Sequence, residues 1–230
     1  MNPLTDILSL LLPRTCPACR RHLKDWEECL CLVCLGQLPV THFDLNPDNP
    51  LAEMFWGRVR LSQAVAWFYF RKGSAYQDAL HKLKYNDRPD IGVSLGKQFG
   101  YELYRSTGFI RPDILIPVPL NPKKLRKRGY NQSEAIAKGL SQGLRIPLVS
   151  NALTRPVATS TQTRKSRYER YLNVAGKFKI TNPALLENLH VLLIDDVITT
   201  GATLEACAEV MLAVPGVTVS VAALAWARND

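Results

Sequence analysis

The sequence lacks the long apolar run that a membrane-spanning helix needs. No stretch of its 230 residues approaches the roughly 20 consecutive apolar residues that cross a bilayer. The first 13 residues carry Asp6 and have no basic residue ahead of their leucines, which argues against a secretory signal. We therefore expect a cytoplasmic protein. Its length allows one α/β domain plus a small module.

Acidic residues are scarce in the middle of the chain. Residues 111–170 hold 13 Lys/Arg against 3 Asp/Glu, a net charge of +10, whereas the whole chain has +9. The positive charge is thus a local feature. It predicts an anionic partner there, either a polyphosphate or a nucleic acid backbone. A solvated basic face is the alternative.

One stretch, Val191–Thr203, organises the rest of the chain. Its first four residues, Val191 to Ile194, are apolar and indicate a strand buried on both faces. Two carboxylates follow at the end of this strand, then a Thr/Gly turn and a helix expected over 203–212. Ligands of open α/β sheets bind outside the carboxyl ends of the strands. A turn of small residues before a helix offers free N–H groups to a phosphate.

The parts of this turn suit a sugar phosphate. Gly201 can take a positive φ, and the neighbouring threonines supply hydroxyl donors. Asp195 and Asp196 repel phosphate but suit vicinal hydroxyls or a metal-bridged ligand. This interpretation requires that the two acids are not turned inward onto a salt partner and that side chains do not plug the bend. The alternatives are an ordinary strand–turn–helix, or a Walker A loop, which fits poorly because no Gly-Lys-Ser/Thr ends the turn.

The stretch resembles the signature of the type I phosphoribosyltransferases, which bind phosphoribosyl pyrophosphate. The resemblance implies that Asp195 and Asp196 bind the ribose 2- and 3-hydroxyls. It also implies that the following residues wrap the 5-phosphate: Val197, Ile198, Thr199, Thr200, Gly201, Ala202 and Thr203. The fold implied is α/β, a doubly wound parallel sheet with helices on both faces. Mg²⁺ would accompany the pyrophosphate.

Five of the six cysteines crowd into the first 34 residues. Two Cys-x-x-Cys knuckles, separated by 11 residues, supply four thiolates of the kind that hold a structural zinc ion: Cys16, Cys19, Cys31 and Cys34. Cys29 is an alternative ligand to Cys31, and Cys207 is expected in the core of the helix after the turn. Ahead of the knuckles, Leu4, Ile7, Leu8 and Leu11 have the spacing of a short amphipathic helix. We expect two domains: 1–50 with this helix and the zinc module, and 51–230.

Further patterns predict the remaining elements of the core. A strand or a hairpin arm is expected over 60–71. Strands are expected over 112–119 and 177–180, with 217–226 closing the sheet, and helices over 76–84, 91–104 and 132–141. Five basic residues between Lys123 and Arg128 are expected in a loop, followed by the helix cap Asn131. A second polar loop, 154–171, carries five more basic residues.

The family resemblance implies a role for each of these two loops. In type I phosphoribosyltransferases the first loop holds pyrophosphate, a role that would fall to Arg128 and Gly129. The second would be a flexible loop that closes over the phosphoribosyl group and excludes water.

The chain as a whole resembles the ComF/GntX family in six features. They are the knuckles, Lys84-Tyr85, Arg128 to Gln132, Thr161-Gln162, Glu169 to Val174 and the Asp-Asp turn. Its members are amidophosphoribosyltransferase-like, and some are tied to DNA uptake in bacterial competence. Two main hypotheses follow. One is a Mg²⁺-dependent phosphoribosyltransferase, and the other is a competence protein that binds single-stranded DNA with the basic segment. Tyr130, Tyr168 and Tyr171 could stack bases there, or they are packing residues. A third is an adaptor that binds a partner through the zinc module.

Overall fold

The computed structural model describes residues 14–85, 88–155 and 178–228. The amphipathic segment expected before residue 14 and most of the loop expected over 154–171 lie outside this part of the chain. Within it, no helix is both long and apolar enough to cross a membrane.

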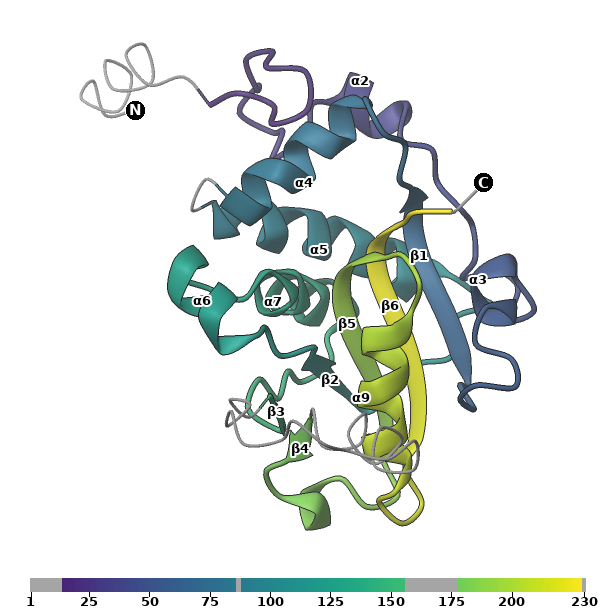
Figure 1. Cartoon of the computed structure of the whole chain (residues 1–230). Coiled ribbons are helices and arrows are strands. Elements are labelled where there is room, and N and C mark those ends of the chain that lie inside the picture. Colours follow the sequence, from purple (N-terminus) through teal and green to yellow (C-terminus); the bar gives the residue numbers. More distant parts are fainter. Residues whose placement is uncertain (1–13, 86–87, 156–177, 229–230) are drawn as a thin grey trace.

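A four-stranded parallel sheet forms the centre of the molecule (Figure 1). Its order is β1 (Gln63–Tyr69), β6 (Thr218–Trp226), β5 (His190–Ile198) and β2 (Ile114–Pro117). The predicted parallel sheet is confirmed, but the expectation that the last strand closes it is wrong. That strand, β6, lies between β1 and β5, because all its residues after Thr218 are buried and its alanines leave room for layers on both faces.

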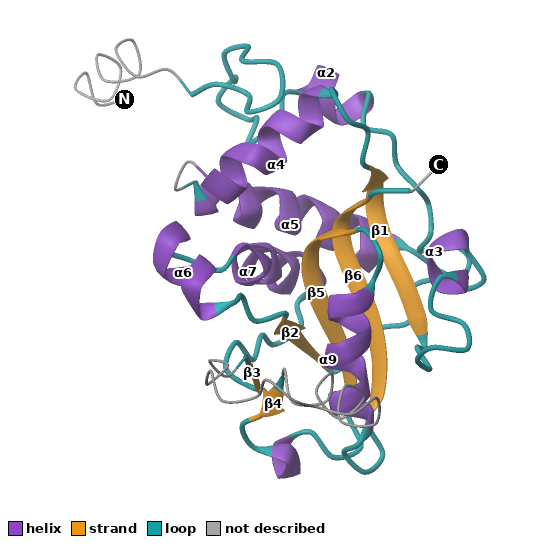
Figure 2. Ribbon diagram, viewed as in Figure 1, coloured by secondary structure: helices purple, strands orange, loops and turns teal. Residues whose placement is uncertain are grey.

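Helices cover both faces of the sheet (Figure 2). Helices α5 (Pro89–Arg105) and α7 (Gln132–Leu144) lie on one face, and α9 (Ala202–Leu212) lies on the other. Alternate residues of β5 serve the two layers: Leu192 and Ile194 join the core under α5 and α7, while Val191 and Leu193 join the core under α9. The doubly wound arrangement predicted from sequence is therefore confirmed.

Helices α5 and α7 approach each other unusually closely because glycines line their contact. A Cβ at Gly96 would collide with the carbonyl oxygen of Ile136, and one at Gly139 with that of Val93. A Cβ at Gly143 would lie 2.5 Å from the carbonyl oxygen of Lys97, and one at Gly100 would lie 2.9 Å from that of Leu140. The two helices run parallel, so their N-termini reach the same edge of the sheet.

The shorter elements connect this core. They are α2 (Leu32–Gly36), α3 (Pro50–Glu53), α4 (Ala75–Tyr85), α6 (Pro122–Arg128), a 3₁₀ turn (Pro183–Leu185), and β3 (Leu153–Thr154) with β4 (Lys179–Ile180). The strand expected over 177–180 is thus β4, and it pairs antiparallel with β3 outside the main sheet.

The basic segment after β2 is a helix, α6, and not the loop that its charge predicted. The side chain of Asn121 accepts a hydrogen bond from Lys123 N at 3.0 Å, and Pro122 occupies the first turn. Gly129 ends the helix in the left-handed region at φ 78°. These caps hold the helix together despite the repulsion among its basic residues. The expected cap Asn131 is confirmed at the start of α7, where it accepts from Ser133 N.

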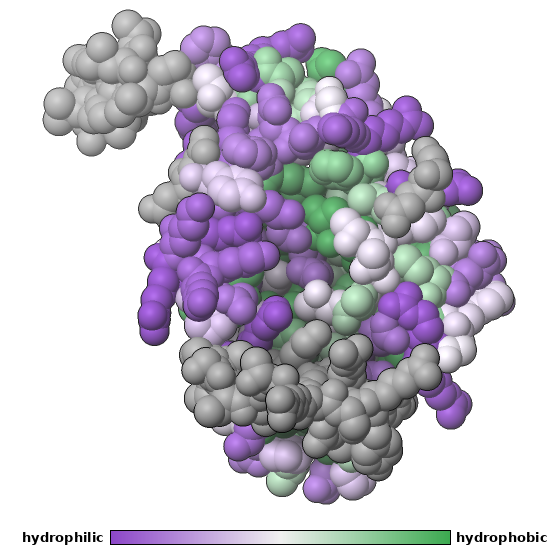
Figure 3. Space-filling model, viewed as in Figure 1, coloured by the Kyte–Doolittle hydropathy of each residue, from purple (hydrophilic) through white to green (hydrophobic). Residues whose placement is uncertain are grey.

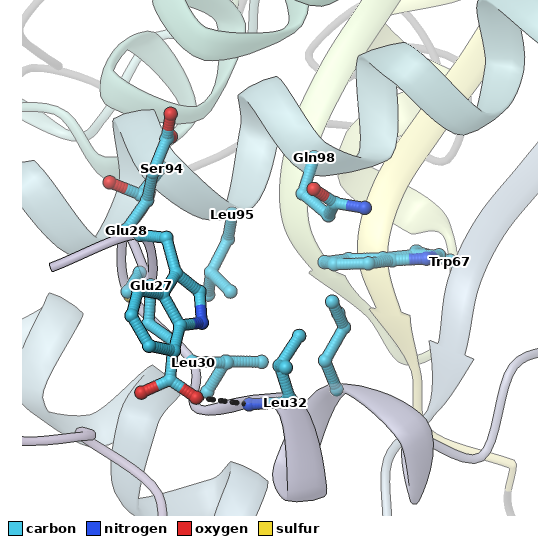
Figure 4. Close-up of a pocket in the computed structure, with 11 residues that line it drawn as sticks. Glu27, Glu28, Leu30, Leu32, Trp67, Ser94, Leu95 and Gln98 are labelled. Atoms are coloured by element: carbon cyan, nitrogen blue, oxygen red, sulfur yellow. Dashed lines mark hydrogen bonds between the residues drawn. The ribbon is translucent and has the colours of Figure 1, made fainter. Parts of the chain in front are cut away.

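The cysteine-rich segment packs directly on the body of the protein. Leu30 and Leu32 face Leu95 of α5 and Trp67 of β1 across a hollow of about 230 Å³ (Figure 4). Glu27 stabilises this side of the hollow by accepting a hydrogen bond from Leu32 N at 2.7 Å. One continuous apolar cluster therefore joins the module to the sheet. The domain boundary at residue 50 stays a prediction.

Candidate functional site

The two acids lie where β5 outruns its neighbour. Strand β2 ends at Pro117, opposite Ile194, whereas β5 continues to Ile198 and pairs there only with β6. The strand is longer than its apolar run predicted, since Asp195 and Asp196 lie within it. One edge of this extension is thus open at the carboxyl end of the sheet, the place where ligands of α/β folds bind.

Asp195 faces the N-terminus of α7. Its Oδ1 accepts hydrogen bonds from Ser133 Oγ at 3.0 Å and from Asp196 N at 2.8 Å. Desolvation and the charge of Asp196 raise the pKa of Asp195 to about 7. A carboxyl group that is half-protonated near neutral pH can either donate to or accept from a hydroxyl group.

Asp196 has a salt partner. Its Oδ2 lies 3.1 Å from Lys84 Nζ, and its Oδ1 accepts from Val197 N at 2.6 Å. The condition that the acids have no salt partner is therefore not met for Asp196. The pair is not sealed in the core, however, because the two side chains keep 15% and 26% of their surface exposed and line an open hollow.

The turn after β5 is open. It encloses a small hollow of about 40 Å³ lined by Asp195 and by residues 197–204. Gly201 has φ 72°, and no side chain among residues 14–85, 88–155 and 178–228 caps the N-terminus of α9. Thr199, Thr200 and Thr203 are exposed. The bend is therefore shaped to receive an anion.

A second hollow of about 190 Å³ adjoins the first, sharing Asp195 and Thr203. It gathers both acids and four cationic residues, Lys84, Lys124, Arg128 and Arg155. Of the two residues expected to hold pyrophosphate, Arg128 lines this hollow, whereas Gly129 ends α6 and is exposed.

Arg128 is held in place from two sides. Its Nη1 donates to Gln132 Oε1 at 2.7 Å, and its guanidinium lies 5.1 Å from the ring centre of Tyr85. Gln132 is buried at the start of α7. These contacts restrict the conformations of a cationic side chain that lines the same hollow as the two acids.

Sequence reasoning gave no role to Lys84 or Ser133. Lys84 belongs to a family motif, the only signal that could have marked it. Ser133 has no local signal, because its contact with Asp195 joins residues 62 positions apart.

The basic residues of α6 project from the surface. Lys123, Lys124, Arg126 and Lys127 are exposed, and no residue of the helix is buried. Figure 3 shows the hydrophilic surface that gathers over α6, beside the site. These exposed basic side chains make the surface of α6 positively charged, and we call this surface the cationic face of α6.

The four predicted zinc ligands converge. The Sγ atoms of Cys16, Cys19, Cys31 and Cys34 all lie within 4.8 Å of one another, and those of Cys19 and Cys31 are 3.6 Å apart. Thiolates about 2.3 Å from a tetrahedral zinc ion lie roughly 3.8 Å from each other, so the arrangement fits zinc.

The other two cysteines play no part in this cluster. Cys29 is buried beside it, and desolvation raises the pKa of its thiol to about 12. Cys31, and not Cys29, thus completes the set of four. Cys207 is buried in α9, as predicted.

Comparison with known proteins agrees with this geometry. Residues 125–230 match the family model of the phosphoribosyl transferase domain. The chain is 32% identical over 231 residues to the DNA utilization protein YhgH of Salmonella typhimurium, covering 92% of this chain and 96% of the relative. It is 27% identical to competence protein ComFC of Bacillus subtilis, covering 89% and 81%. Competence protein F of Haemophilus influenzae is 36% identical over 44% of each chain.

The domain match contains the acid pair, the open turn and Arg128, which lie together in the structure. The match to YhgH, in contrast, extends over nearly the whole chain. The chain therefore belongs to the ComF/GntX family of proteins with a phosphoribosyltransferase-like domain.

Proposed function

We propose that the protein binds phosphoribosyl pyrophosphate at the carboxyl end of β5. The observation that carries this proposal is the pair of adjoining hollows. The uncapped N-terminus of α9 borders one hollow, and four cationic side chains line the other together with the two acids. A ligand with a diol between two phosphate groups matches this sequence of charges.

Each part of the ligand has a counterpart in the site. The ribose hydroxyls would meet Asp195 and Asp196, and the 5-phosphate would meet the backbone of residues 197–203. The pyrophosphate would meet Arg128, with Gly129 at the end of the same helix. Lys84 would keep its contact with Asp196 as the diol binds.

Mg²⁺ fits the same place, because it prefers carboxylate and phosphate oxygens. When bound, it would neutralise charge on the pyrophosphate as that group departs. Displacement of pyrophosphate from ribose C1 develops positive charge on the sugar and negative charge on the leaving group. The residues of this site hold charges of the complementary sign near each. We accordingly propose a phosphoribosyltransferase.

The four cysteines are proposed to hold a structural zinc ion. Their sulfur atoms already lie at the spacing that tetrahedral coordination needs, and little apolar core lies within the module itself. The cytoplasmic location expected from the sequence stays a prediction.

Isothermal titration calorimetry with phosphoribosyl pyrophosphate and Mg²⁺ tests the main proposal. We expect micromolar to millimolar binding by the native protein and none by the double variant Asp195→Asn/Asp196→Asn. Asp78→Asn, which changes an exposed carboxylate on α4, serves as the control and should bind normally. Absence of binding by the native protein would refute the proposal.

A second function is favoured by the cationic face of α6 and by the similarity to competence and DNA utilization proteins. Competence and DNA utilization proteins are similar to this chain. We propose that single-stranded DNA and other competence proteins bind this face. Changing Lys123, Lys124, Arg126 and Lys127 to Gln should weaken DNA binding and flatten its salt dependence. An unchanged affinity and salt slope would reject this function.

A further inference from the structure

Helix α4 touches three separate parts of the molecule with three consecutive residues. Lys82 Nζ donates to the carbonyl oxygen of Pro17, in the first cysteine knuckle, at 3.0 Å. The carbonyl oxygen of Leu83 accepts from the hydroxyl of Tyr130, between α6 and α7. Lys84 Nζ lies 3.1 Å from Asp196 Oδ2. Less than one helical turn thus connects the cysteine module, the basic segment and the acid pair.

The other end of α4 is also fixed to the module. Tyr76 OH donates to the carbonyl oxygen of Cys34, in the second knuckle, at 2.8 Å. The helix is therefore attached to both knuckles, and both acceptors are backbone oxygens. Their positions depend on the fold of the knuckles, which in turn depends on the bound metal.

The helix transmits such a change because it is packed as a unit. Ala79, Leu80 and Leu83 are buried, and Leu80 and Leu83 belong to the same apolar cluster as the cysteines and the strand residue Leu192. A shift of the knuckles that displaces the helix must also move Lys84, since a well-packed interior transmits displacement.

We propose that α4 couples the cysteine module to the acid pair, with Lys84 as a positioning residue for Asp196. Metal loss or a broken tether would withdraw Lys84 and leave two adjacent carboxylates uncompensated. The structural part of this inference stands without a ligand, whereas its effect on binding rests on the proposed function.

Two variants cut the tethers without touching the site: Lys82→Met and Tyr76→Phe. Lys97→Met is the matched control. Lys97 Nζ contacts Glu28 of the module at 2.6 Å, but it does so from α5 and does not lead to Asp196. Hydrogen exchange is measured for residues 83–85 and 195–198 in the zinc-loaded proteins and in chelated native protein. Zinc content is measured in parallel.

We expect both tether variants to keep their zinc yet lose amide protection at 83–85 and 195–198, as the chelated protein does, with Lys97→Met unchanged. Affinity for phosphoribosyl pyrophosphate with Mg²⁺ should fall about fivefold or more in the tether variants. Unchanged exchange in the tether variants and in the chelated protein overturns the coupling, as does an equal loss in Lys97→Met. If the native protein binds no ligand, only the proposed function fails, because the exchange result still decides the coupling.

Discussion

The cysteine module and the sheet reach a defined structure in different ways. In the module, four thiolates converge from residues 16 to 34, and few apolar side chains of its own are buried. In the sheet, whole strands are buried, and the acid pair meets Ser133 only because distant segments converge. The module therefore depends on a few local ligands, whereas the sheet and its site depend on the packing of the entire body.

Removing one thiolate should have the largest effect, and this effect should fall on the cysteine module and not on the sheet. We expect Cys34→Ser to hold less than one zinc ion per chain and to lose amide protection across residues 14–38. The reason is that zinc binding, with apparent energies of about 10–16 kcal/mol, supplies the folding energy of such modules. Strand β6 and residues 190–194 of β5 should stay protected. Elemental analysis and hydrogen exchange provide the two measurements.

Cys29→Ser is the matched control for that experiment. Its thiol is buried beside the cluster but lies outside it, so one zinc ion per chain should remain. Loss of zinc in Cys29→Ser with retention in Cys34→Ser would show that the wrong cysteine has been assigned.

A change at the α5–α7 contact should instead weaken the body and spare the module. In Gly139→Ala the new Cβ would collide with the backbone of Val93 and lie 2.6 Å from Lys97 N. We expect a loss of about 3 kcal/mol in the free energy of unfolding, as for other overpacked contacts, measured by urea denaturation with zinc present. Gly36→Ala, whose Cβ would meet nothing within 4 Å, should change stability little. Equal effects of both would contradict the close-packing argument.

The raised pKa of Asp195 predicts that the free energy of unfolding of the body depends on pH. Its pKa of about 7 exceeds the ordinary carboxyl value, so the folded state holds this proton more tightly than the unfolded state. Stability from this group is therefore lost as pH rises from about 4 to 7. Asp195→Asn should gain stability relative to the native protein at pH 8, and this gain should shrink at pH 4.5. A gain that is the same at both pH values in urea denaturation would contradict the assignment, and Asp78→Asn should show none.

Much of the fold could be predicted because apolar runs are local. Val191 to Ile194 and the residues around Ile114 to Ile116 are buried strands, as expected. The interior position of β6 could not be predicted, since strand order is decided by how the helices pack. Helix α6 was missed because its charge outweighed its caps, Asn121 and Gly129, which were visible in the sequence.

Some residues of the site could likewise be predicted from the sequence, and others could not. The Asp-Asp turn and the four zinc ligands are contiguous or closely spaced motifs, so the sequence marks them. Lys84 and Ser133 reach the acid pair through contacts between distant segments. No periodicity or spacing records such contacts, and a side chain without a motif can be found only once the packing is known.

The smallest loss of stability is expected from a change at the turn after β5. Arg58 pairs with Glu205 and donates to the carbonyl oxygens of Met54 and Thr200, each at 3.1 Å, but the two charged side chains keep 34% and 22% of their surface exposed. Arg58→Met should therefore cost less than about 1 kcal/mol of stability, while amide exchange at residues 199–201 becomes faster. A larger loss in urea denaturation would mean that the turn is as tightly packed as the strands. Weak restraint by an exposed cation would let the turn adjust to the phosphate of the proposed ligand, in contrast to the buried strand that carries the acids.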